Sequence, residues 1–157
     1  MTDHATHVLD ALAALRTAIA ADVPEQELTP FLDVAVAIVR GEPGYDREAM
    51  VAAAAPLVAD NEGGLAAALN ALEGLLTSTF YDQEWRWACE RRSKLEAVRT
   101  LWAEQLGGPG APYLDCEGVD DLLRRKGDHE GGLRPEQIPP GTPTSHWWWW
   151  YPATPPA

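Results

Sequence analysis

A run of five consecutive aromatic residues, Trp147 to Tyr151, limits the possible folds of this sequence more than any other feature. Four tryptophan side chains can bury about 600–1000 Å². That area exceeds the largest exposed apolar patch of an ordinary soluble monomer, roughly 300–600 Å². Trp147, Trp148, Trp149 and Trp150 must therefore be covered, either by their own domain or by a partner.

The 157 residues are enough for one domain, since a domain of this size buries about 70% of its extended-chain surface. Hydrophobic periodicity predicts an all-α fold, a compact bundle of about five or six helices within residues 3–126. Residues 135–157 contain seven prolines and no helical period, which predicts an extended tail of polyproline character. We therefore expect an acidic helical domain, 1–126, and a tail, 127–157, that packs at least partly on that domain.

Apolar residues three and four positions apart place the first helices. Residues 3–22 are predicted to form an amphipathic helix, and a Thr-Pro cap begins a second helix over 30–40. This second segment is almost wholly apolar and is therefore expected to be central, although its β-branched residues also suit a strand. Asp46 caps a third helix, which Pro56 is expected to kink or end.

Residues 62–106 carry the clearest apolar stripes, and the sequence leaves open whether they form one helix or two. The part that begins at Asp82 presents four apolar residues on one face: Ala88, Leu95, Val98 and Trp102. A short last helix is predicted over 116–126, with Gly127 as its C-terminal stop.

The helix from Asp82 also carries four charges of alternating sign, spaced four residues apart: Asp82, Arg86, Glu90 and Lys94. Together with Arg92 and Glu96, they predict a solvated face stabilised by ion pairs within the helix. Because Trp and Arg are enriched at binding hot spots, the interleaved Trp85, Trp87 and Arg91 form an alternative docking surface.

Acidic residues outnumber Lys and Arg by 24 to 12, which gives a net charge of −12. This excess argues against a nucleic acid or an anionic membrane as the main ligand and favours a basic protein partner. Residues 1–80 carry 12 acids and 3 bases, so the negative charge is concentrated in the N-terminal half. Four of the acids expected to face the partner are Asp33, Glu42, Asp46 and Glu48. The oligomeric state stays open.

Two cysteines, Cys89 and Cys116, cannot form a disulfide framework in a chain of this size. Both are expected to be reduced, which predicts a cytoplasmic protein. The first four residues lack the basic region of a secretory signal, and Asp and Pro interrupt each apolar run before about 18 residues. The sequence therefore predicts neither export nor a membrane span.

The side chains that could take part in catalysis or metal binding lack the partners that such sites require. His4 and His7 lie one turn apart, but a catalytic zinc takes three protein ligands and no third is nearby. His129 has no identifiable nucleophile beside it, and no glycine-rich segment matches a phosphate-binding pattern. We expect no catalytic residue, no metal and no cofactor.

The aromatic tail admits two interpretations. In the first, at least two of its tryptophans pack on the bundle near Trp85 or Trp102, and the others stay partly exposed. In the second, residues 146–151 are a docking peptide or a segment that another enzyme modifies. His146 could add a pH-sensitive hydrogen bond, but the expectation for a lone histidine is an ordinary polar residue.

Three classes of function follow from these patterns. The preferred one is a non-catalytic, acidic helical binding protein, of the kind that immunity proteins and antitoxins represent, which inhibits a basic partner. The second is a carrier or adaptor that acts through the aromatic tail. The third is an enzyme of unrecognised type.

Overall fold

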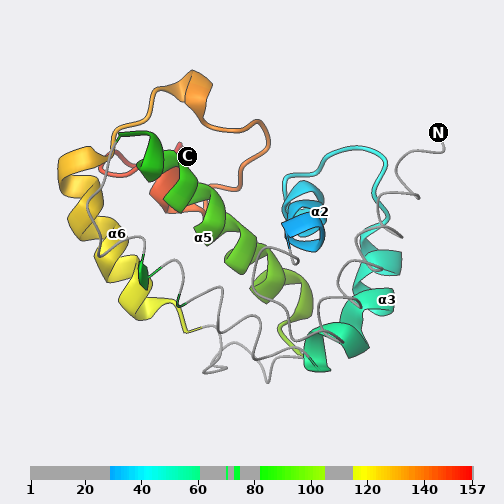
Figure 1. Ribbon diagram of the computed structural model, residues 1–157. Coiled ribbons are helices and arrows are strands. Elements are labelled where there is room, and N and C mark those ends of the chain that lie inside the picture. The colour runs from blue at the N-terminus through cyan, green and yellow to red at the C-terminus, as the bar shows by residue number, and fades with distance from the viewer. Residues whose placement is uncertain (1–28, 61–69, 71–72, 75–81, 105–114, 157) are drawn as a thin grey trace.

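The computed structural model describes residues 29–60, 70, 73–74, 82–104 and 115–156 (Figure 1). Within these ranges the fold is all-α, as predicted, and contains no strand. The elements are α2 (Thr29–Val39), α3 (Arg47–Asp60), α5 (Asp82–Trp102), α6 (Glu117–Glu130), and the short 3-10 helices η3 (Pro135–Gln137) and η4 (Trp147–Trp149). The helix predicted over 3–22 and most of the apolar stripe before Asp82 lie outside the described residues. The total number of helices therefore remains a prediction.

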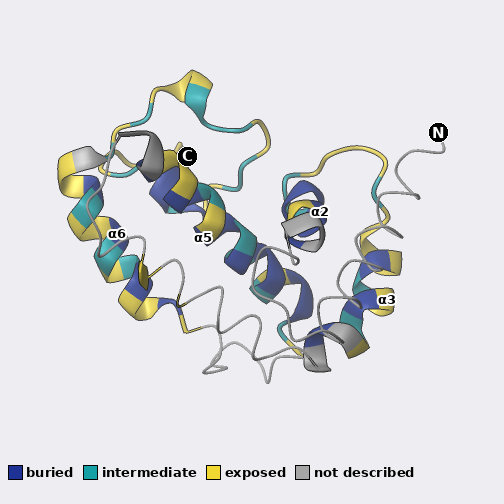
Figure 2. Cartoon of the chain, in the orientation of Figure 1, coloured by how far each residue is buried: buried dark blue, intermediate teal, exposed yellow. Residues whose placement is uncertain are grey.

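The central element is α5, because α2, α3, α6 and η4 all pack against it. Figure 2 shows buried residues along its length. The predicted apolar face is confirmed, since Ala88, Leu95, Val98 and Trp102 are all buried. At the C-terminal end of this face, the Trp102 indole donates a hydrogen bond to the backbone oxygen of Val51 in α3, at 3.0 Å. No helix in the described ranges combines the length and apolarity needed to cross a membrane.

The connection between α2 and α3 is fixed by hydrogen bonds at both helix ends. Gly41 adopts φ 73°, and its N–H binds the oxygen of Ile38, while the N–H of Glu42 binds the oxygen of Ala37. These two bonds close the C-terminus of α2 in the manner of a glycine cap. The predicted cap of the next helix is confirmed, because Asp46 Oδ1 accepts the N–H of Ala49 at 3.0 Å.

Pro56 does not end α3, which continues to Asp60. Proline removes the hydrogen bond that would reach the carbonyl of Ala52, four residues earlier. Both residues are exposed, so water can bind that carbonyl and the helix can pass through the proline.

At Glu90 and Lys94, the predicted ion-pair ladder along α5 is replaced by pairs with Arg40 and with α2. The predicted partner of Arg86, at Asp82, lies outside the described side chains. Arg40, beyond the end of α2, donates two hydrogen bonds to Glu90, at 2.8 and 3.2 Å, and Lys94 contacts Asp33 of α2 at 3.1 Å. This face of α5 therefore packs against α2 instead of facing only solvent. A guanidinium that binds a carboxylate through two nitrogens fixes the pair geometrically. The predicted pair within the helix, Arg92 with Glu96, is present at 2.9 Å.

Candidate functional site

The aromatic run is not extended, because residues 147–149 form the single 3-10 turn η4. A 3-10 helix has three residues per turn, so residues three apart lie on the same side. Trp148 and Trp149 face the core and are 1% and 0% exposed, whereas Trp147 and Trp150 are half-buried. The turn thus divides four identical side chains into an inner pair and an outer pair.

One hydroxyl holds the inner pair. Ser93 lies fully buried in α5, and its Oγ accepts the indole N–H of Trp148 at 3.1 Å and of Trp149 at 2.9 Å. The same Oγ lies 3.0 Å from Nδ1 of His146. A serine hydroxyl has two acceptor sites and one proton. Both acceptor sites are taken by the indoles, so the proton of Ser93 must go to His146.

This arrangement requires a neutral histidine whose Nδ1 is the acceptor. Burial lowers the pKa of His146 from 6.5 to about 4, although the nearby Glu96 acts in the opposite direction. The guanidiniums of Arg92 and Arg40 lower the pKa further. His146 also stacks on Trp148, with ring centroids 4.9 Å apart. It is therefore a buried component of the tail's attachment and not the ordinary polar residue that the sequence predicted.

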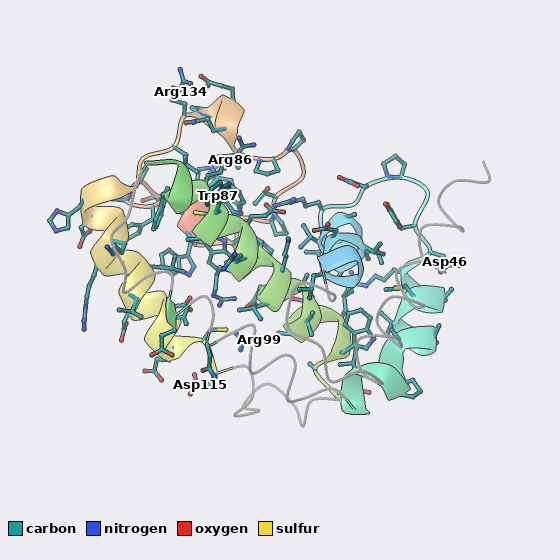
Figure 3. All side chains as sticks on the ribbon, in the orientation of Figure 1. Asp46, Arg86, Trp87, Arg99, Asp115 and Arg134 are labelled. Carbon is teal, nitrogen blue, oxygen red and sulfur yellow. The ribbon has the colours of Figure 1, made fainter. Side chains whose placement is uncertain are left out.

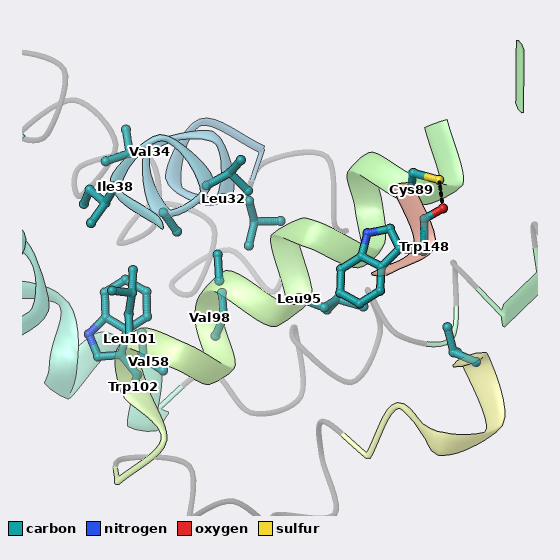
Figure 4. Packing of buried hydrophobic residues seen from close by; sticks show 14 of the residues in the cluster. Leu32, Val34, Ile38, Val58, Cys89, Leu95, Val98, Leu101, Trp102 and Trp148 are labelled. Carbon is teal, nitrogen blue, oxygen red and sulfur yellow. Dashed lines mark hydrogen bonds between the residues drawn. The ribbon is translucent and has the colours of Figure 1, made fainter. Parts of the chain in front are cut away.

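Arginine side chains cover the faces of the tail's indoles. The Arg92 guanidinium lies 4.4 Å from the ring centroid of Trp148, and that of Arg124 in α6 lies 4.6 Å from the ring of Trp147. Arg92 also binds Asp120 of α6 at 2.7 Å, which joins α5 to α6 beside the tail. The Cys89 thiol, also in α5, approaches the backbone oxygen of Trp148 at 3.5 Å (Figure 4).

Gly127 does not stop α6, which runs on to Glu130 and is closed by Gly131. Instead, Gly127 is a buried helical residue whose missing side chain leaves room for the ring of Tyr151. The tail is held there by two hydrogen bonds: the Tyr151 hydroxyl donates to Asp128 at 2.6 Å, and the Gly132 N–H donates to the Tyr151 oxygen at 3.0 Å. Glycine can mark a helix end or a close approach, and here it marks a close approach.

Replacing Gly127 by alanine is expected to lower the free energy of unfolding by about 1–3 kcal/mol, as overpacking does. The added Cβ would overlap the ring of Tyr151 and would lie 2.9 Å from Cη2 of Trp85. The matched control is Gly118→Ala on the same helix, where no heavy atom lies within 4 Å of the added carbon. That control should raise stability by up to about 1 kcal/mol, because alanine favours a helix. Urea denaturation measures both, and equal gains in stability would contradict the close packing of Tyr151.

Ser93 and His146 lie as close together as a catalytic nucleophile and its general base, but the serine hydroxyl is not available for reaction. Both acceptor sites of the hydroxyl are occupied by indole N–H groups, and the residue is not exposed to a substrate. Burial also raises the pKa of the Cys89 and Cys116 thiols, which keeps them protonated. Among the described residues, no group of three or more His, Cys, Asp or Glu side chains could hold a metal ion, and His4 and His7 lie outside those residues.

A polar cleft of about 400 Å³ lies between α5 and the start of α6. Its two cations are already engaged, Arg99 with Glu96 at 3.1 Å and Arg124 with Asp121 at 3.2 Å. Carboxylates supply most of the remaining lining. The cleft therefore combines both charge signs, and its two arginines already have carboxylate partners.

The residues predicted to bind a partner divide between the core and the surface. Trp85 is fully buried, which removes it from the predicted docking surface, because the tail and α6 cover it. Trp87 and Arg91 are exposed on the same helix. The four predicted acids are also exposed: Asp33, Glu42, Asp46 and Glu48. Figure 3 shows Asp46 toward one end of the molecule, well separated from Trp87.

Sequence reasoning missed the two residues that anchor the tail, Ser93 and His146. A signal for Ser93 was present, because it stands four residues after Cys89 and four before Ala97, on the buried stripe of α5. A polar residue in such a stripe requires a hydrogen-bond partner. Nothing in the spacing identifies which distant segment supplies that partner.

No protein-family model, no curated protein and no solved structure matches the chain.

Proposed function

We propose that this chain is a non-catalytic binding protein that engages a basic protein partner through an acidic edge, defined here as Glu42, Asp46 and Glu48. Inhibition of that partner, as immunity proteins and antitoxins act, is the mode of action we infer. The support comes from the exposure of these carboxylates, from the hydrogen bonds that fix the backbone beneath them, and from the net charge of −12.

The acidic edge is the observation that carries the proposal. Within the described part of the chain, none of its three carboxylates takes part in an ion pair. The glycine cap of α2 fixes the backbone at Glu42, and the first turn of α3 fixes Asp46 and Glu48. Exposed charges on a fixed backbone steer a partner of opposite sign, and that backbone loses little entropy on binding. Asp33 is also exposed, but it already contacts Lys94.

The burial of Trp148 and Trp149 favours this proposal over an adaptor that acts through residues 146–151. A docking peptide would have to leave the core, which would expose two indoles and the Ser93 hydroxyl. Only the outer side of η4, with Trp147 and Trp150, is available without such a change.

The test begins with affinity capture of the tagged full chain and identification of its partner by mass spectrometry. The double variant Glu42→Gln, Glu48→Gln is then expected to slow association with the purified partner about tenfold at low salt. This difference should shrink as salt is added, since the screening length falls from about 30 Å at 0.01 M to about 3 Å at 1 M. Asp46 is left intact because it caps α3.

The matched control is Glu104→Gln, Glu117→Gln, which removes the same charge from other exposed positions. Glu48 and Glu117 both stand in the first turn of a helix, so the two double variants also lose a similar helix-dipole interaction. Equal effects of the two variants would show a general charge effect and contradict the acidic edge. An acidic partner, or an association rate that salt leaves unchanged, would contradict the proposed function as a whole.

A further inference from the structure

All seven tryptophans lie within the described residues, and six of them pack at least partly in the core. Trp87 is the exception, with 54% of its surface exposed, whereas the other six are buried or half-buried. An indole is the largest apolar side chain and a frequent binding anchor. Packing within the described part of the chain therefore does not explain its exposure on α5.

The two arginines beside Trp87 differ from the other basic residues of α5 in their ion pairing. Arg92, Lys94 and Arg99 each contact a carboxylate. Arg86, the preceding residue, and Arg91, one turn further on, are exposed and form no ion pair within the described part of the chain. Figure 3 shows Arg86 and Trp87 together, away from Asp46 of the acidic edge.

The opposite side of the same helical turns is firmly packed. Trp85, Ala88, Cys89 and Ser93 are all fully buried, and the tail is hydrogen-bonded to the last of them. The backbone beneath Trp87 and Arg91 is thus held in place before any ligand arrives. A preorganised surface loses less conformational entropy on binding.

We propose that Trp87, Arg86 and Arg91 form a second binding surface, which takes a short carboxylate-rich segment of a protein. The two guanidiniums bind carboxylates through paired N–H groups, and the indole covers an apolar side chain between them. A nucleic acid fits less well, because its charge continues along its whole length and would extend over a protein with net charge −12. A short segment avoids that repulsion, since charges beyond about 8 Å are screened at physiological salt.

The probe is a synthetic peptide with four glutamates around a central leucine, and its binding to the full chain is measured by isothermal titration calorimetry. Trp87→Ala and Arg91→Gln are each expected to weaken the affinity about tenfold, in the range of interface hot spots. Arg125→Gln is the matched control, because it removes an arginine that is also exposed, but on α6, and should change the affinity less than about twofold. Circular dichroism should show all three variants folded.

Three results would overturn this second surface. The first is a wild-type chain that does not bind the peptide. The second is an affinity that Arg125→Gln lowers as much as Arg91→Gln does. The third is tighter binding of an eight-residue oligothymidylate that also depends on Trp87. The Glu42→Gln, Glu48→Gln variant should not lower the peptide affinity, so failure here and failure of the acidic edge are separate outcomes.

Discussion

Replacing Trp149 by alanine is expected to lower the free energy of unfolding by about 3–5 kcal/mol, as for other buried aromatic residues. The indole is fully buried, and its N–H is one of the two that Ser93 accepts. The substitution therefore creates a large cavity and leaves the hydroxyl of Ser93 with an unused acceptor site. Because a domain is stabilised by only about 5–15 kcal/mol, chemical denaturation should detect the loss readily.

Trp87→Ala is the internal control for this result. It deletes the same side chain from the same central region of the fold, but from a position that is 54% exposed. Its effect on stability should stay within about 0.5 kcal/mol, as for other surface substitutions. Should the two variants lose similar stability, the aromatic tail would not be part of the core.

Acidification is expected to destabilise the fold through His146. The unfolded chain binds a proton at this residue near pH 6.5, whereas the folded chain does so only near pH 4. Between these values the unfolded state holds more protons, so the free energy of unfolding falls as the pH falls. This residue alone can lower the free energy of unfolding by about 3 kcal/mol. The decrease begins near pH 6.5 and is complete below about pH 4. The proton enters at Nδ1, where it would face the hydroxyl proton of Ser93.

The control is His146→Asn, which can place an amide oxygen where Nδ1 accepts but cannot titrate. Carboxylates contribute to acid denaturation in both proteins, so the difference between the two pH profiles isolates the histidine. Urea denaturation at several pH values from 7 to 4 provides that difference. Parallel profiles would contradict the neutral, buried histidine.

The sequence predicted those parts of the fold that depend on local pattern. The apolar face of α5 follows from spacing alone, and the cap at Asp46 follows from the preference of aspartate for that position. The strand alternative for residues 30–40 is wrong, because α2 is helical. Its β-branched residues reflect burial in the core, where α2 packs against α5, and not a strand.

The errors arose where a local pattern depends on a distant neighbour. Glu90 and Lys94 have the spacing of pairs within a helix, but Arg40 and Asp33 from another part of the chain bind them instead. Gly127 is a residue type that commonly ends a helix, but here its small size is required by the ring of Tyr151. Spacing along one helix does not reveal which other helix will lie beside it.

The same limit applied to the candidate site. The need to cover the aromatic run followed from its apolar area, and the exposure of Trp87 and Arg91 is compatible with the predicted docking surface. The division of the run into an inner and an outer pair was not predictable, because it depends on the 3-10 turn of η4. The role of His146 depends on a hydroxyl 53 positions earlier in the chain.

That separation also affects the order in which the core can assemble. Ser93 and its three partners are 53 to 56 residues apart, so their contacts close a long loop, and the entropy of loop closure opposes them until the intervening chain is organised. The pairing of Arg92 with Glu96 and the first turns of α5 involve no such loop. Contacts that form after the transition state govern the unfolding rate more than the folding rate. If the indoles dock after the transition state, their hydrogen bonds to Ser93 slow unfolding and leave the folding rate nearly unchanged. The hydroxyl of Ser93 then determines the lifetime of the folded chain.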